Sequence, residues 1–549
     1  VQMLITSRER LQLRSEQLYQ VPPLSVAPNA TLAEATVSSA ARLFVQSAQF
    51  VQADFQLTPT NLAAVLRICD LVQGMPLGVE LAAAQVGSLP LDAIADAIAQ
   101  SAEFLTAAWV DVPARQRSMR AVFAWSWHLL SAAEQRVLRQ SAIFRGGFDY
   151  AAAQAVIDAK PALLTVLVDK SLLQWQAAAT GEGRYAMHEL LCQFAAEELD
   201  AAGEREAVAA QHGRYYLSYL AARGLRLGRG EPKQASAEIQ PDLDNVRQAW
   251  QWAASQGRLA ELEEATYAWW QFCQFCDLEA EGRQSFGVAV ASIRRRLAQP
   301  LADEETALLG QRLLAKLLAI HADYLFAQGC DAAMAAQARE AIQLGATSGG
   351  VEGETFGTFV LARALHELDQ RREAGDLWRQ TIQLVLAYQP THPESELLHE
   401  VHWMAHTCLR GSALHFGDYG GSRAYMVQAL QLAQRLGKRR CELISLSFLG
   451  QTDVFLFDIV RAAPSLVAAI DLARALGYRR SEMDSLEGLA VMARLSGDYT
   501  TALRLLEQNL MLATELALPY DESFALAALV RLHCQLGNAP AVMQRSEPL

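Results

Sequence analysis

Apolar and polar positions alternate with a helical period through most of the second half of the chain, and the pattern repeats. The stretch LHFGDYGGSRAYMVQALQLAQRLG (414–437) resembles ARLSGDYTTALRLLEQNLMLATELA (493–517). The turn positions lie 40 residues apart, at Gly417, Phe457, Gly497 and Gly537. The ends of the second helices keep the same spacing, at Gly437, Gly477 and Ala517. A period near 40 with paired amphipathic helices predicts a helical solenoid.

The repeat continues upstream with one interruption. Gly329 and Asp369 are 40 residues apart, whereas the next step to Gly417 is 48, and AYQPTHPESELL supplies the extra loop. Before these repeats, the segment from residue 241 is predicted to form irregular first helix pairs. Its four tryptophans either fill the core between helices, which we favour, or stack on a ligand: Trp250, Trp252, Trp269 and Trp270.

Residues 119–200 have the pattern of short helices followed by a hairpin. Ser131 with Glu134 three residues later has the spacing of a capping box. Four helices are predicted first, and strands are then expected at LLQW (172–175) and RYAMH (184–188). The helices and this hairpin together make a winged-helix shape. Direct DNA reading is not expected, because only Arg136, Arg139 and Arg145 supply positive charge nearby.

The first residues have the pattern of a buried parallel strand, VQMLI, that ends in Thr6, Ser7 and Arg8. In open α/β sheets the ligand-contacting groups lie at the carboxyl ends of strands, and arginine suits a phosphate. A polar strand exit with a solvated arginine is the simpler alternative. Further on, Gly74 is predicted to close one helix and Pro76 to open the next.

Composition supports a packed multidomain chain. The 549 residues are 52% hydrophobic and 19% charged, with a net charge of −13, which does not fit a whole-chain nucleic-acid binder. The basic runs 294–296 and 438–440 are interpreted as solvated helix ends. Eight scattered cysteines and the lack of an 18-residue apolar run or a signal peptide lead us to expect a cytoplasmic protein without membrane contact. Cys273 with Cys276, and His402 with His406, are interpreted as packing rather than metal sites.

Three motifs together give a resemblance to a known family. LITSRERL followed by GMPLGVELAAA resembles the sensor strand and the GLPL motif of the STAND signal-transduction ATPases, the NB-ARC-like or AP-ATPase class. The resemblance implies that Arg8, with Thr6 and Ser7, reads the terminal phosphate of ATP and that Pro76 contacts the base. Met75 replaces the commoner leucine and keeps the apolar character.

The histidine at position 188 belongs to the third motif. FAWSWHLLSAAEQRVLRQSAIFRGGF and LVDKSLL resemble the winged-helix domain of bacterial STAND proteins, and YAMHELL stands where that family has its MHD motif. The resemblance implies that His188 approaches the β-phosphate of ADP, with Glu189 in place of the aspartate. A structural histidine at a strand-to-helix junction is the alternative. A zinc-protease motif is excluded because position 192 is cysteine.

The resemblance implies a mainly α fold in five parts: the end of an α/β P-loop NTPase core (1–27), a helical lid (28–112), a winged helix (113–202), irregular first repeats (203–300) and a tetratricopeptide-like solenoid (301–549). No GxxxxGK[ST] occurs, so no catalysis is expected from this chain alone. We expect the C-terminal part of a longer switch protein, of the kind found in LuxR- and SARP-type transcriptional regulators. That protein would bind ATP or ADP with Mg²⁺ and self-associate on activation.

In that protein, the repeats would bind a protein or a small inducer. Two other hypotheses stay open from the sequence. One is a protein-interaction scaffold with degenerate nucleotide motifs. The other is a DNA-binding regulator that uses the winged helix.

Overall fold

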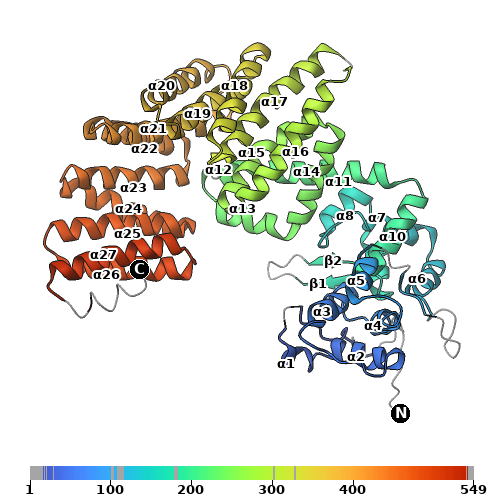
Figure 1. The fold of residues 1–549 in the computed structure, drawn as a ribbon. Helices are drawn as coiled ribbons and strands as arrows, with labels where there is room; N and C mark the ends of the chain where they lie inside the picture. Colours follow the sequence, from blue (N-terminus) through green and yellow to red (C-terminus); the bar gives the residue numbers. More distant parts are fainter. Residues whose placement is uncertain are drawn as a thin grey trace. The chain divides into compact units, whose positions relative to one another are not determined.

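The computed structural model describes residues 16–17, 19, 21–28, 30–100, 104–107, 117–177, 183–300, 303–326, 329–538 and 541. Within these residues the chain is almost entirely helical, with one two-stranded sheet (Figure 1). The predicted mainly α fold is therefore confirmed. The predicted first strand lies outside the described residues. The chain divides into two compact units: unit 1 is Val1–Tyr216 with Asp242–Ala249, and unit 2 is Leu217–Pro241 with Trp250–Leu549. The five predicted domain boundaries stay predictions.

Unit 1 begins with a group of five helices around an apolar core. They are α1 (Leu32–Ala35), α2 (Ser39–Val51), α3 (Leu62–Leu71), α4 (Pro76–Ala83) and α5 (Leu91–Gln100). Helix α2 packs on α4 and α3 packs on α5. Phe44, Ile68 and Leu81 are completely buried between them. Removing side chains of this size from water is the main stabilising contribution to such a group.

The second part of unit 1 contains the predicted helices and hairpin. The elements are α6 (Met119–His128), α7 (Ala132–Ser141), α8 (Tyr150–Ile157), α9 (Pro161–Asp169), β1 (Gln174–Gln176), β2 (Arg184–Ala186), α10 (Glu189–Ala201) and the start of α11 (Arg205–Ala221). The predicted capping box is confirmed, because the Ser131 N–H donates to Glu134 and the Ser131 hydroxyl accepts from the Glu134 N–H. The predicted hairpin is confirmed too, with Trp175 opposite Tyr185. The winged-helix identity stays a prediction.

Unit 2 is a series of antiparallel helices, in which each helix from α15 to α27 packs on the next (Figure 1). Its elements are α12 (Gly224–Arg229), α13 (Pro232–Ile239), α14 (Leu243–Gln256, whose first residues belong to unit 1), α15 (Leu259–Phe275), α16 (Glu279–Leu297), α17 (Glu304–Tyr324), α18 (Asp331–Ser348), α19 (Val351–Glu367), α20 (Arg371–Tyr388), α21 (Glu396–His415), α22 (Tyr419–Leu436), α23 (Arg439–Phe455), α24 (Ile459–Leu476), α25 (Arg479–Leu495), α26 (Tyr499–Glu515) and α27 (Pro519–Gln535). Trp250, Trp269 and Trp270 are buried, as expected for core residues, and Trp252 is half-buried.

The predicted period of 40 residues is confirmed by the backbone. Left-handed residues recur in the turns, alternately after the first and the second helix of each pair: Gly417, Gly437, Phe457, Gly477, Gly497, Ala517 and Gly537. The residue after each donates its N–H to a carbonyl five positions earlier, for example Asp418 to Ala413 at 2.8 Å. Asp418 then caps the next helix by accepting from the Gly421 N–H. Each turn thus ends one helix and starts the next.

In the part of the chain that the structure describes, no single helix is long and apolar enough to cross a membrane. The pair α8 and α9 reaches that length only together, and it is bent by 112°.

Candidate functional site

The connection between α3 and α4 is a tight elbow that requires glycine. Gly74 has φ +65°, and a Cβ there would lie 2.1 Å from the Leu24 carbonyl oxygen. The Leu24 N–H donates to the Gly74 carbonyl at 2.9 Å. Pro76 occupies the first turn of α4, where it loses no helical hydrogen bond. The sequence predicted both positions correctly, and the extended segment at Leu24 fixes the elbow from outside.

Pro76 lines an open cavity of 330 Å³ on the surface of unit 1. The other lining residues are Leu24, Ser39, Arg42, Leu43, Gln46 and Glu80. A neighbouring cavity of 280 Å³ shares Arg42 and Gln46 with it. A proline ring and a leucine side chain beside one exposed guanidinium provide an apolar surface with a permanent positive charge, which suits a flat ring carrying anionic groups. Arg42 was not singled out from the sequence. The only available signal was a lone basic residue within the apolar stripe of its helix.

His188 lies at the start of α10 and caps it. Its Nδ1 atom accepts a hydrogen bond from the Leu190 N–H at 3.3 Å. An Nδ1 atom that accepts carries no proton in the neutral ring, so the proton belongs on Nε2. The Nε2 atom is buried and has no hydrogen-bond partner among the described residues. A purely structural role as a helix cap therefore accounts for Nδ1 of His188. It leaves the N–H at Nε2 without an acceptor.

The ring of His188 faces the elbow. Burial lowers its pKa, and the nearby backbone carbonyl of Val72 partly offsets that lowering, although it makes no hydrogen bond of good geometry with Nε2. Val72 is the C-cap residue that follows α3, in the turn that leads to Pro76. The structure thus brings His188 beside the connection between α3 and α4. It does not place His188 on the wall of the cavity beside Pro76. Thr6, Ser7 and Arg8 lie outside the described residues.

A buried polar network holds the hairpin of unit 1 against α11 and α14. Arg184 on β2 makes a two-pronged contact with Asp242, at 3.0 and 2.8 Å, and Tyr216 donates to the same carboxylate. Asn245 donates to the Gly147 carbonyl at 3.0 Å and contacts His212 at 3.1 Å. These largely buried groups satisfy one another, so removing one member leaves others unpaired.

The arginines that a DNA-binding role would need are partly used inside unit 1. Arg139 makes a two-pronged contact with Glu204, at 3.1 and 2.6 Å. Arg136 donates to the carbonyls of Ile157 and Asp158. Arg145 is exposed. Two of the three basic side chains therefore serve packing within the unit.

In unit 2, the sequence interpretation of residues 438–440 as a solvated helix end is wrong for Lys438. Its side chain is 1% exposed and forms ion pairs of 3.0 Å with both Glu396 and Glu400 on α21. Burial by itself would lower the pKa of Lys438, but the carboxylates, Glu400 above all, hold it well above its usual value. Arg229 pairs with Glu396 and Arg440 with Glu400. The partners come from helices remote in sequence, so the local pattern could not reveal them.

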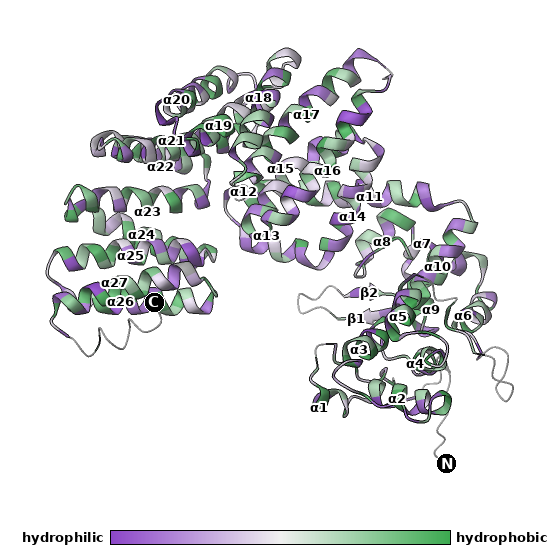
Figure 2. Ribbon diagram, in the orientation of Figure 1, coloured by the Kyte–Doolittle hydropathy of each residue, from purple (hydrophilic) through white to green (hydrophobic). Residues whose placement is uncertain are grey.

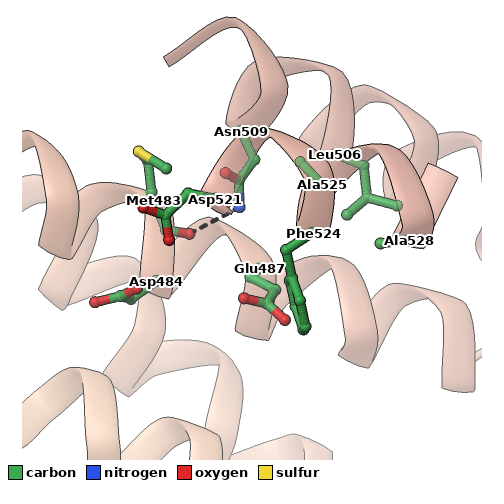
Figure 3. Close-up of a pocket in the computed structure, with 9 residues that line it drawn as sticks. All are labelled: Met483, Asp484, Glu487, Leu506, Asn509, Asp521, Phe524, Ala525 and Ala528. Carbon is green, nitrogen blue, oxygen red and sulfur yellow. Dashed lines mark hydrogen bonds between the residues drawn. The ribbon is translucent and has the colours of Figure 1, made fainter. Parts of the chain in front are cut away.

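Unit 2 contains cavities between its helices, two of which involve ionisable side chains. One, of 210 Å³, lies among α15, α17, α19 and α21, where Lys316 bridges Glu263 and Glu352. The other, shown in Figure 3, lies among α25, α26 and α27 and has a volume of 20 Å³. Asn509 donates to the Met483 carbonyl at its edge, and burial raises the pKa of Asp484 and Glu487. A space of that size holds one water molecule.

Among the described residues, no group of three or more His, Cys, Asp or Glu side chains is placed to hold a metal ion. His402 and His406 are both buried on α21, with ring centroids 5.2 Å apart, and burial lowers the pKa of each to about 4. Cys273 is buried, and Cys276 lies 3.2 Å from the Ser236 hydroxyl. The interpretation of both pairs as packing stays a prediction.

Comparison with known proteins gives relatives that extend well beyond this chain. Proteins of Mycobacterium tuberculosis and Mycobacterium bovis, provisionally named HTH-type transcriptional regulators, are 34% identical over 266 residues, which is 47% of this chain and 29% of theirs. Uncharacterized proteins of the same two organisms are 30% identical over 221 residues, 39% of this chain and 53% of theirs. The chain thus spans under a third of the first relatives. No family model matches.

Two of the solved structures to which this chain is similar are a STAND protein and a quorum sensor. A STAND protein with a tetratricopeptide repeat sensor from Pyrococcus horikoshii has 15% identity and a TM-score of 0.45, over 95% of this chain and 72% of that one. The apo form of the quorum sensor NprR from B. thuringiensis has 11% identity and a TM-score of 0.40, over 65% of this chain and 91% of that one.

Proposed function

We propose that this chain is the regulatory portion of a nucleotide-dependent switch of the STAND class, in which unit 1 holds ADP in a closed state and the repeats of unit 2 receive the signal. In the complete protein, ATP with Mg²⁺ would favour an open state. The output would be transcription or another response through a further domain. The provisional naming of the mycobacterial relatives as transcriptional regulators supports that assignment.

The observation that carries the proposal is the unpartnered Nε2 of His188 beside the elbow. A buried N–H without an acceptor costs free energy, about 1–3 kcal/mol, that an anionic oxygen would recover. A phosphate oxygen is such an acceptor. The open cavity beside Pro76 offers an apolar surface for the base, and its Arg42 guanidinium suits a phosphate or ribose oxygen. Arg8 would read the terminal phosphate.

The nucleotide would supply the charge and the binding energy that distinguish the two states. The residues of this chain would hold it: Pro76 on one side of the base and His188 on a phosphate. A signal on the repeats can shift the balance only by binding one state more tightly than the other. The signal is proposed to be a protein or a small molecule, and its identity is not assigned.

Calorimetric titration of ADP into the protein extended upstream of Val1, far enough to include its nucleotide-binding core, tests the proposal. We expect saturable ADP binding that ATP competes away. If that protein binds neither nucleotide, the chain is instead a scaffold with degenerate nucleotide motifs. DNA retardation by this chain alone would favour the regulator that uses its own winged helix.

A further inference from the structure

The turn between α23 and α24 exposes an unusual amount of apolar surface. In the sequence FLFDIV (455–460), Phe457 is 74% exposed and Val460 84%, and Phe455, Leu456 and Ile459 are exposed as well. Phe457 also has φ +56°, in the left-handed position that glycine occupies in the neighbouring turns. That conformation costs a side-chain-bearing residue about 1–2 kcal/mol. The repeat therefore carries two unfavourable features at once, and neither serves its own packing.

The neighbouring turns continue this surface. The Tyr419 and Phe455 rings lie 6.4 Å apart, which joins the α21–α22 turn to the α23–α24 turn. By the 40-residue repeat, Ile459 and Leu495 occupy the corresponding pair of positions in the next turn. The end of α23 at this edge has a hydrophobic colour in Figure 2. We name the exposed apolar side chains of these three turns the turn ridge: Phe416, Tyr419, Phe455, Leu456, Phe457, Ile459, Val460, Leu495 and Tyr499.

The turn ridge has the size of a protein interface. With about 150–250 Å² for each fully exposed aromatic side chain and less for the aliphatic ones, its exposed fractions amount to roughly 800–900 Å². A stable interface of standard size buries about 800 Å² on each partner. Isolated apolar patches on a monomer are smaller.

We propose that the turn ridge joins two copies of this chain in a two-fold symmetric dimer. The ridge repeats at each turn, so a second copy running in the opposite direction can place its apolar side chains between those of the first. Such a surface is self-complementary, as a two-fold interface requires. At the rim, Arg461 pairs with Asp458 of the same turn, so this pair adds no net charge to the contact.

The dimer follows from the ridge alone and does not depend on nucleotide binding. The net charge of −13 opposes association of two copies at low ionic strength. Added salt screens this repulsion between the two copies, whereas it does not weaken the apolar contact between them. The dimer should therefore tighten when salt is raised from about 0.02 to 0.3 M, whereas an interface held by ion pairs would weaken.

Sedimentation equilibrium of the 549-residue chain tests the proposal. We expect a monomer–dimer equilibrium in the wild type and about hundredfold weaker dimerisation in the variant Phe457→Gly with Val460→Gln, because each change counts twice at a two-fold axis. Glycine suits the backbone at position 457, so this variant folds. Leu386→Gln removes another exposed apolar side chain, 55% exposed on α20 and outside the ridge, and should leave dimerisation unchanged.

Two results would overturn the dimer. One is a wild-type chain that stays monomeric at about 100 µM in both salt conditions, a concentration at which even a weak interface of this class is populated. The other is a dimer whose affinity is the same in the wild type and in the ridge variant.

Discussion

The backbone carbonyl of Val72, at the end of α3, faces the imidazole of His188, at the start of α10. The two residues lie 116 positions apart in the sequence. Their meeting places the histidine motif against the elbow that presents Pro76. A ring whose Nδ1 caps a helix and whose Nε2 has no partner is held in one orientation and can still donate one hydrogen bond. This geometry is what the proposed nucleotide role requires of unit 1.

The elbow itself should be sensitive to a single methyl group. We expect Gly74→Ala to destabilise the chain by about 2 kcal/mol or more, because a left-handed backbone costs alanine about 1 kcal/mol and the new Cβ meets the Leu24 carbonyl. Gly203→Ala is the matched control: Gly203 has φ +68° with nothing within 4 Å of an added Cβ. Thermal unfolding of both variants measures the difference in stability. An equal loss of stability in both would show that the contact with Leu24 does not contribute.

The network around Asp242 should contribute far more to the free energy of unfolding than a solvent-exposed ion pair does. Asp242→Asn leaves the half-buried Arg184 without its counter-charge, and we expect a loss of about 3 kcal/mol. The neighbouring pair of Arg247 with Asp244 is exposed, and Asp244→Asn should cost less than about 1 kcal/mol. Urea unfolding of the two variants makes the comparison. A smaller loss in Asp242→Asn than in Asp244→Asn would contradict the buried network.

His212 should make unit 1 sensitive to acid. Burial lowers the pKa of His212 from 6.5 to about 4, against a smaller opposing effect of Asn245. The unfolded chain therefore binds the proton first, and stability falls as the pH drops from about 6.5 to about 4. A shift of this size corresponds to roughly 3 kcal/mol at the acid end.

The measurement is the free energy of unfolding of unit 1 at pH 7 and pH 5. His212→Gln should flatten the difference between these two values, because glutamine does not titrate. His128→Gln, a change at an exposed histidine of the same unit, should leave the difference as in the wild type. An unchanged pH dependence in His212→Gln would show that another group is responsible.

The repeats were predictable because their signal is local. Gly417, Gly497 and Gly537 stand in turns that need a left-handed residue, and the caps that follow lie within three positions of the helices they start. The capping box at Ser131 and the elbow at Gly74 and Pro76 are equally local. A short window contains both partners in each of these cases.

The rest could not be predicted because the partners are distant. Lys438 looked solvated in its own sequence, yet its carboxylates come from α21, about 40 positions earlier. Arg184 and Asp242 are 58 positions apart, and nothing near either residue indicates the other. Phe457 was counted as an ordinary turn position of the repeat. Only its backbone angle and exposure distinguish it.

The affinity for ADP of the protein extended upstream of Val1 tests the nucleotide role of His188 most directly, when the variant His188→Asn is compared with the wild type. Asparagine caps helices well, so α10 should persist and thermal stability should be kept. The donor at Nε2 is lost, and we expect ADP binding at least tenfold weaker, the loss of one hydrogen bond to a charged group. Unchanged ADP affinity in His188→Asn, with α10 intact, would contradict the account.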